Sequence, residues 1–501
     1  MKHGIFHIVC AASILSTGCM VGPKYTRPAA VAPPAFKEPP PPDFKEAETQ
    51  GWKQSQPADA FLKGKWWEIY QDPALNALEE QVAVSNENVQ QAEALYREAR
   101  ATVRVSRAAL FPTVSVGPSI SFAQSGAGNG ANSVTSSGVV LSGASTSVRQ
   151  NYNLPFEVSW APDLWGAVRR GITGSVDTAQ AVAADLENAR LLYQSELAED
   201  YFQLHGVDAD EALLRQTETS YAEYLTLTKN RFDAGVASDL DVAQAESQLS
   251  STQSALIDLG VQRAQLEHAI AILTGKAPAD VTISETPLTA LPPAVPVGVP
   301  SQLLERRPDI AGAERRVAAA NEQIGIAMAA FYPNLTLSGS AGLQNSSLTK
   351  WFSWPSRFWS VGPQLAETLF DAGRRRGVVE QQRAAYDATV AAYRQTVLTA
   401  LQQVEDNLAA LRILQAEAAK VQETVGSAQR ELNVSTEQYK AGIQSYLTVI
   451  TAQATLLAAQ RSQVSLLSRR MVASVTLVQA LGGGWQDANL PTRQEVTPGA
   501  R

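Results

Sequence analysis

The stretch QYKAGIQSYLTVITAQATL, from Gln438 to Leu456, repeats the pattern of RFDAGVASDLDVAQAESQL, from Arg231 to Leu249. Both copies carry an aromatic residue, an Ala-Gly pair, and then Ser, Leu and Val at matching offsets. Long heptad patterns flank each copy, so each copy is interpreted as the turn of a helical hairpin. The repeat predicts one architecture built from two similar halves.

Turn chemistry supports this interpretation. Glycine ends a helix readily because it adopts the left-handed conformation that other residues resist, which predicts helix ends at Gly235 and Gly442. A serine follows each glycine, and the hydroxyls of Ser238 and Ser445 are expected to accept the first free N–H groups of the next helix.

Composition excludes several functions. Only 18% of the 501 residues are charged and the formal net charge is −8, with no basic domain, so nucleic acid is not an expected partner. Four His and two Cys show no metal spacing, and neither a nucleophile–base set nor a phosphate loop is present. We therefore expect no catalytic residues, no metal and no bound cofactor, and the chain is not predicted to be an enzyme.

The N-terminus has the pattern of a secreted lipoprotein. Residues 1–18 form a signal peptide, and both cysteines lie within the first nineteen residues. The segment from Leu15 to Cys19 resembles a bacterial lipobox, although its Leu is one position further from the Cys than usual. A lipid on Cys19 is expected, and the alternative is an ordinary signal peptide with an incidental cysteine. Residues 19–60 are rich in proline and predict an extended, lipid-anchored strap.

The first repeat is predicted over residues 61–275. A heptad pattern from Leu75 to Val103 predicts one helix, which stops at Phe111-Pro112. Alternating apolar residues then predict a β-hairpin with a long loop. A helix of about 100 Å follows over residues 168–233, then the turn, then a helix of half that length ending near Leu273.

The same scheme restarts after a proline-rich linker at residues 276–300. The second repeat covers residues 301–484, with a helix over 302–330, strands near 335–337 and 358–370, and a long helix over 374–440. Residues 485–501 are predicted to be a polar, disordered tail.

The predicted fold is mostly α with a small β part. No apolar stretch of about 18 residues follows the signal peptide, so passage through a membrane would require β-strands. Four strands cannot close a barrel alone, whereas three copies of the chain would supply twelve. Two short helices stacked end to end would equal one long helix in length. The assembly would then be a helical tube continuous with a barrel.

Several motifs resemble the outer membrane efflux lipoproteins of the TolC/OprM/NodT type, the outer membrane factor family. They include Cys19–Tyr25, Leu303–Ile310 (LLERRPDI), Leu369–Arg374 and Ala480–Trp485. The resemblance implies a homotrimer with a twelve-stranded outer membrane β-barrel and a periplasmic α-barrel. It also implies export of drugs, dyes or other small organic molecules, together with a periplasmic adaptor and an inner membrane pump, most simply of the RND type.

The same resemblance implies a gate at the periplasmic tip, where the turns converge. The apolar ring of that gate corresponds to Leu447, and acidic positions of the family correspond to Thr448 and Thr451. Because this chain carries threonine there, we expect closure to rest on Leu447 packing and neutral hydrogen bonds. Leu447 also fits a heptad core position.

Tyr439 and Asp241 correspond to residues that link neighbouring hairpins in the family, whereas Gln444 replaces an arginine. Asp241 also lies three residues after Ser238, which is the spacing of a capping box. Both roles for Asp241 remain open on the sequence.

Two other functions share these features. A periplasmic coiled-coil scaffold or adaptor would show the heptads but would not need two β-hairpins. The outer membrane duct of a type I protein secretion system would use a similar tube. The lipoprotein start and the LERRPD stretch favour tripartite efflux.

Overall fold

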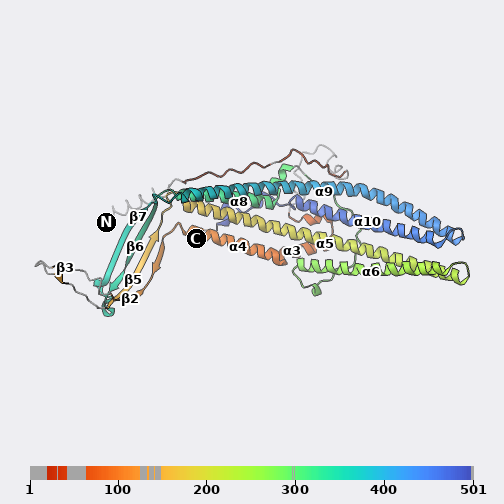
Figure 1. Cartoon of the computed structure of the whole chain (residues 1–501), viewed down its shortest axis with the longest axis horizontal. Coiled ribbons are helices and arrows are strands. Elements are labelled where there is room, and N and C mark those ends of the chain that lie inside the picture. The colour runs from red at the N-terminus through yellow and green to blue at the C-terminus, as the bar shows by residue number, and fades with distance from the viewer. Residues whose placement is uncertain are drawn as a thin grey trace.

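The computed structural model describes residues 20–30, 32–41, 64–124, 133–134, 140–141, 148–295, 297 and 300–497. The signal peptide and Cys19 lie outside these residues. The chain is strongly elongated, with a β-sheet at one end and two helical hairpin turns at the other (Figure 1). Within the described residues, no helix has both the length and the apolarity to cross a membrane.

The helices confirm the two repeats. Corresponding helices have equal lengths, with 67 residues in each long helix, 35 in the helix after each turn, and 22 in the helix before each hairpin. They are α5 (Ala167–Asp233) and α9 (Arg374–Lys440), α6 (Asp239–Leu273) and α10 (Tyr446–Ala480), and α4 (Glu87–Ala108) and α8 (Pro308–Ala329).

The helix before each hairpin is interrupted, which corrects the prediction of one unbroken helix. In the first repeat α3 (Pro73–Ser85) ends at Asn86, whose side chain accepts the N–H groups of Asn88 and Val89 and so starts α4. In the second repeat α7 (Leu303–Arg306) ends at Arg307, before Pro308. Proline disfavours helical backbone in the preceding residue but is well placed in the first turn of a helix.

Each interruption receives the end of another helix. The Asn86 amide donates to the carbonyl of Leu273, the last residue of α6, at 2.9 Å. Arg307 Nη1 donates to the carbonyl of Ala480, the last residue of α10, also at 2.9 Å. Thus α6 abuts α4 and α10 abuts α8, and the predicted end-to-end stacking of short helices is confirmed. We call these two places the joints.

The sheet is antiparallel, in the order β1-β5-β6-β7, with β2 also paired to β5. A single register runs through β1 and β2, because Thr113 opposes Ser159 and Ser119 opposes Asn153. Gly117-Pro118 divides what is otherwise one edge strand, since proline has no N–H to donate. The two predicted hairpins are present, but the last strand ends at Ala366 rather than near Phe370. The strands are β1 (Thr113–Val116), β2 (Ser119–Ala123), β5 (Arg149–Trp160), β6 (Asn334–Asn345) and β7 (Arg357–Ala366), with the small pair β3 (Ser133–Val134) and β4 (Val140–Leu141).

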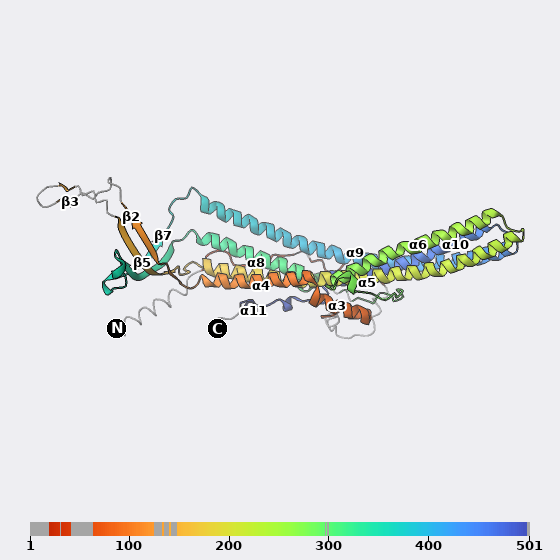
Figure 2. The ribbon, with the colours of Figure 1, turned by 90° about the horizontal axis from the view of Figure 1, so that it is seen from below.

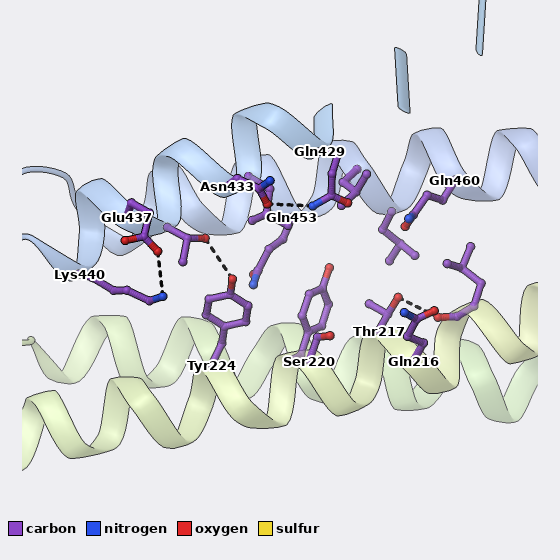
Figure 3. Close-up of a pocket in the computed structure, with 16 residues that line it drawn as sticks. Gln216, Thr217, Ser220, Tyr224, Gln429, Asn433, Glu437, Lys440, Gln453 and Gln460 are labelled. Atoms are coloured by element: carbon purple, nitrogen blue, oxygen red, sulfur yellow. Dashed lines mark hydrogen bonds and ion pairs between the residues drawn. The ribbon is translucent and has the colours of Figure 1, made fainter. Parts of the chain in front are cut away.

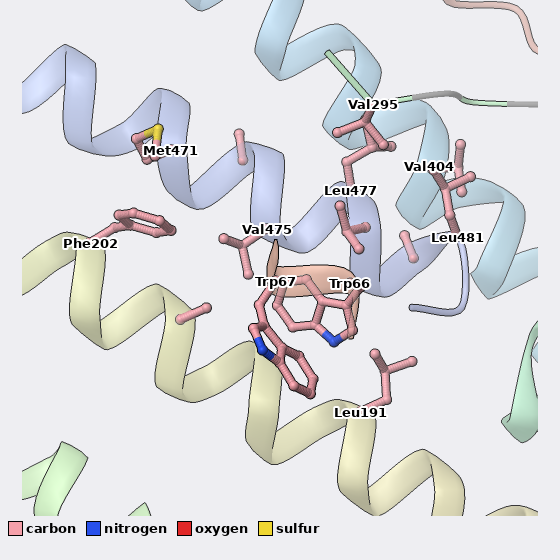
Figure 4. Packing of buried hydrophobic residues seen from close by; sticks show 14 of the residues in the cluster. Trp66, Trp67, Leu191, Phe202, Val295, Val404, Met471, Val475, Leu477 and Leu481 are labelled. Atoms are coloured by element: carbon pink, nitrogen blue, oxygen red, sulfur yellow. The ribbon is translucent and has the colours of Figure 1, made fainter. Parts of the chain in front are cut away.

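The main core lies midway along the molecule, at the level of the joints. Trp66 and Trp67, in a short 3-10 helix at Trp66–Tyr70, insert between α5 and α10 (Figure 4). Their rings meet edge to face, with centroids 5.8 Å apart. Large side chains from α5, α9 and α10 surround them, including Phe202, Val404 and Met471.

The described part of the N-terminal strap, residues 20–30 and 32–41, is extended, as predicted, and runs along the helices (Figure 1). Near the sheet, the buried guanidinium of Arg170 donates to the carbonyls of Val21 and Pro23 and forms a 2.8 Å ion pair with Glu322. Further along, Glu405 on α9 accepts the backbone N–H groups of residues 37 and 38, at 2.7 and 2.8 Å. Polar side chains thus replace the backbone partners that an isolated extended segment lacks.

The segment after the second repeat is ordered as far as Thr497, which corrects the prediction of a disordered tail. Trp485 is buried beside Ala184 and Ala311, and Val496 is buried beside Val103 and Val176. The segment contains a 3-10 turn (Asp487–Asn489) and a short helix, α11 (Arg493–Val496), which begins with a capping box. Polar contacts add to these apolar anchors, because Gln180 Nε2 donates to the Pro491 carbonyl at 2.8 Å.

Candidate functional site: the paired turns at the helical tip

The two turns lie side by side at the end of the molecule opposite the sheet (Figures 1 and 2). Gly235 and Gly442 have φ angles of +73° and +76°. After each glycine, the next N–H reaches back into the helix that is ending, from Val236 to the Arg231 carbonyl at 2.8 Å and from Ile443 to the Gln438 carbonyl at 2.9 Å. The two turns therefore have the same backbone.

Their helix starts differ. In the first turn Asp241 accepts both the N–H and the hydroxyl of Ser238, each at 2.9 Å, and Ser238 Oγ accepts the Asp241 N–H at 3.3 Å. This is a complete capping box. Within the chain, the Asp241 carboxylate therefore serves the helix start, which is one of the two roles left open by the sequence.

The expected cap by Ser445 is wrong. Its backbone has the N-cap conformation, but its hydroxyl accepts no N–H from α10. The counterpart of Asp241 is Thr448, whose hydroxyl donates to the side chain of Gln444 at 3.3 Å. Because the Thr448 hydroxyl bonds Gln444 and not the backbone of Ser445, the second turn has no capping box and starts its helix less firmly.

Leu447 is 56% exposed, and its counterpart Leu240 is 65% exposed. Within a single chain, Leu447 is therefore not a core residue, contrary to its heptad position. The Thr451 hydroxyl donates to the Leu447 carbonyl at 2.9 Å, so it is occupied inside its own helix. The tip presents exposed leucines and neutral hydroxyls at these positions.

The hairpins meet through Tyr439, which is only 4% exposed. The Arg231 guanidinium carbon lies 4.6 Å from the centre of the Tyr439 ring, and Arg231 Nη1 donates to the Lys440 carbonyl at 3.2 Å. Sequence reasoning overlooked Arg231. The available signal was its place in the last turn of α5, where a cation faces helix-end carbonyls.

A small aromatic cluster continues the seam between the hairpins. Tyr446 packs on Tyr439 with ring centres 5.2 Å apart, and burial raises the pKa of Tyr446 to about 12. Tyr224 and Thr436 share a 3.0 Å hydrogen bond across the seam (Figure 3). Both residues line a cavity of about 490 Å³ between α5 on one side and α9 and α10 on the other. Among the described residues, no group of three or more His, Cys, Asp or Glu could hold a metal ion.

Comparison with known sequences identifies the family. The family described as outer membrane efflux protein matches residues 78–276 and 299–483, one stretch in each repeat. The chain belongs to the outer membrane efflux protein family. The resemblance seen in the motifs is thereby confirmed.

Relatives match over nearly the full length. The toluene efflux pump outer membrane protein TtgF of Pseudomonas putida is 30% identical, covering 96% of this chain and 97% of the relative. The pyoverdine export outer membrane protein OpmQ of Pseudomonas aeruginosa is 30% identical over 86% of this chain and 89% of its own length. The outer-membrane channel OprN has a TM-score of 0.81 at 29% identity, covering 93% of this chain and all of that structure.

These matches define the role of the molecule. It is an outer membrane channel component of an efflux system, located in the outer membrane. Its relatives are transport channel proteins rather than enzymes.

Proposed function

We propose that three copies of this efflux protein form one duct, gated at its periplasmic tip, for small organic molecules. The observation that carries this proposal is the open sheet. Its edges are β1/β2 on one side and β7 on the other, and in the described structure neither edge has a second strand partner. Unpaired strand edges are not tolerated in lipid, so copies of the chain must join edge to edge.

The side chains at these edges agree with insertion in lipid. Val114 and Ile120 on the first edge are more than half exposed, as are Trp359 and Val361 on the other. The helices also form a row. Helix α5 packs against α4 and α6 of its own repeat and against α8 and α10 of the other, whereas α9 packs mainly along α8 and α10. A curved row with two free edges closes into a tube when copies meet edge to edge.

The strap supports the proposed lipid on Cys19. Arg170 fixes the carbonyls of Val21 and Pro23, and the Val21 N–H donates to the Trp165 carbonyl at 3.1 Å. Trp165 lies where the sheet joins α5, so the strap begins at the base of the sheet. A diacylglyceryl anchor at Cys19 would therefore reach the inner leaflet of the outer membrane.

Partners and substrates follow from the same arrangement. We infer a periplasmic adaptor at the tip and, beyond it, an inner membrane pump of the RND type. Val236, Leu240 and Ile443 are each more than 60% exposed at the turns, which suits an apolar contact with such an adaptor. The relatives named for toluene and pyoverdine export suggest small organic molecules as cargo.

The first test is the protein mass of the mature, detergent-extracted particle, measured by light scattering with the detergent subtracted. Three chains per particle, together with discrete conductance steps in a planar bilayer, would support the duct. A monomer without conductance would contradict it and would favour the periplasmic scaffold. Restoration of protein secretion, but not of drug resistance, in a strain lacking its own duct would favour type I secretion.

A further inference from the structure

One cation crosses from the first hairpin to the second at the tip. Arg231 belongs to α5, and its guanidinium stacks over Tyr439 of α9 and donates to the carbonyl of Lys440, the last residue of α9. The carbonyls at a helix C-terminus carry the negative end of the helix dipole. Arg231 therefore makes two favourable contacts with the opposite hairpin, one with a ring face and one with a helix end.

The hydroxyl of Tyr439 does not take part in this link. It is buried and has no hydrogen-bond partner in the described part of the chain. Asp241 Oδ2 already accepts the backbone N–H and the hydroxyl of Ser238. Within one chain, the aromatic face of Tyr439 joins the hairpins, and its phenol oxygen does not.

A small buried cluster also holds this seam, in which Ala245 of the first hairpin packs with Tyr439, Tyr446 and Val449 of the second. Behind the tip, the cavity of about 490 Å³ is lined mainly by amides and hydroxyls, and Gln453 and Tyr224 reach into the space between the hairpins (Figure 3). Beyond the cavity, Arg461 of α10 donates three hydrogen bonds of 2.7 to 3.1 Å to the Asp210 carboxylate of α5. Separation of the hairpin ends would therefore break the Arg231 contacts together with this small cluster, and would leave the main core at the joints in place.

We propose that Arg231 is the latch of the gate, a positioning residue that holds the second hairpin, and with it Leu447, against the first. This proposal rests on the tip gate proposed above. In each chain, the interaction that keeps the gate closed is then the Arg231 guanidinium stacked over the Tyr439 ring. The threonines at 448 and 451, which replace acidic positions of the family, are not needed for it.

The test is the leak of the closed channel. Purified wild-type protein and variants are reconstituted in planar bilayers, and the open probability is measured at fixed voltage and salt. Arg231→Ala should raise the open probability roughly tenfold, the factor that corresponds to about 1.4 kcal/mol. Tyr439→Ala should have a similar effect, and Arg231→Lys should lie between because lysine keeps the charge but not the planar stacking.

Two further variants make the result specific. Tyr439→Phe keeps the ring and removes only the hydroxyl, so its leak should stay far below that of Arg231→Ala. Lys229→Ala is the matched control, because Lys229 pairs at 2.8 Å with Glu246 inside the first hairpin and its loss removes the same charge. Its leak should equal that of wild type.

The proposal is contradicted if the Tyr439→Phe channel has the same open probability as the Arg231→Ala channel. That result would assign closure to the phenol oxygen. The proposal is also contradicted if Arg231→Ala and Lys229→Ala behave alike. Failure of the duct itself has a different signature, because wild-type protein would then give no channel at all. Unchanged particle mass and melting temperature for Arg231→Ala would exclude general unfolding.

Discussion

The two repeats differ most at the places where each reverses or interrupts its helices. At the joints they reach the same geometry with different residues, since Asn86 and Arg307 both bind the last carbonyl of the abutting helix. At the turns they share one backbone but not one cap, because Asp241 closes a capping box and Thr448 does not. Each joint is buried and carries a side-chain hydrogen bond to the abutting helix, whereas the second turn has no side-chain cap. From this contrast we expect the helical region at the joints to be rigid and the second hairpin turn to be more mobile.

The largest effect should come from filling the glycine at a joint. A Cβ on Gly482 would lie 2.1 Å from the Arg306 carbonyl oxygen, and the φ of +97° already disfavours a side chain. Gly482→Ala should therefore destabilise the protein by about 3 kcal/mol or more. Denaturant unfolding measures this loss.

The matched control is Gly442→Ala at the second turn. A Cβ there meets nothing within 4 Å, so only the strain of a φ of +76° applies. The expected cost is about 1 kcal/mol. Equal losses at the two glycines would contradict the contrast between joint and tip.

The next effect distinguishes the two joints. Arg307 donates to Asp309, Gln403 and the Ala480 carbonyl, and it is almost fully buried. Arg307→Ala should cost about 3 kcal/mol because it leaves buried acceptors without a donor. Asn86→Ala removes a neutral side chain and should cost about 1–2 kcal/mol. Thermal or denaturant unfolding of both variants would show the order, and the reverse order would refute it.

A pH effect should separate the first repeat from the second. Glu79 on α3 is fully buried without a hydrogen-bond partner in the described chain, and burial raises its pKa well above 4.5. The folded state then keeps a proton that the unfolded state releases. Wild-type stability should therefore fall as pH rises from about 4.5 through the raised pKa.

Glu79→Gln should reduce this slope and make the protein more stable than wild type at high pH. Part of the slope should remain, because burial also raises the pKa of Asp177, Glu199 and Asp200. The exposed neighbour Glu80 forms an ion pair with Lys65, so Glu80→Gln serves as the control and should keep the slope. Melting temperatures measured from about pH 4 to about pH 9 test the difference. Parallel curves for wild type and Glu79→Gln would show that Glu79 does not titrate differently in the fold.

The smallest effect concerns the caps. Ser238→Ala breaks the capping box and should cost about 1 kcal/mol. Ser445→Ala removes a hydroxyl that caps nothing and should cost only a few tenths of a kcal/mol at most. Hydrogen exchange of the first turns of α6 and α10 measures both, and a larger loss at Ser445 would reverse the assignment.

Local patterns predicted the parts of this fold that depend on neighbours in sequence. Heptads, the Ala-Gly turns and the alternating strands located the long helices, the hairpins and the repeat correctly, because each of these elements has a periodic or turn-specific signature within a few residues. The interruption at Asn86 was missed because the heptad pattern from Leu75 to Val103 passes through it. The interruption at Arg307 was missed although Pro308, which follows it, is a local signal for a helix start. The ordered segment around Trp485 was missed because two apolar residues do not form a periodic pattern.

The sequence by itself determined the family, the two repeats and the lengths of the helices, since motif and period are local properties. Only the tertiary structure decided that Asp241 serves a cap, that Leu447 is exposed within the chain, and that Arg231 meets Tyr439. Those contacts join residues about two hundred positions apart, or depend on which of several possible partners a side chain binds. That choice depends on distance and burial in the folded chain, which no local pattern contains.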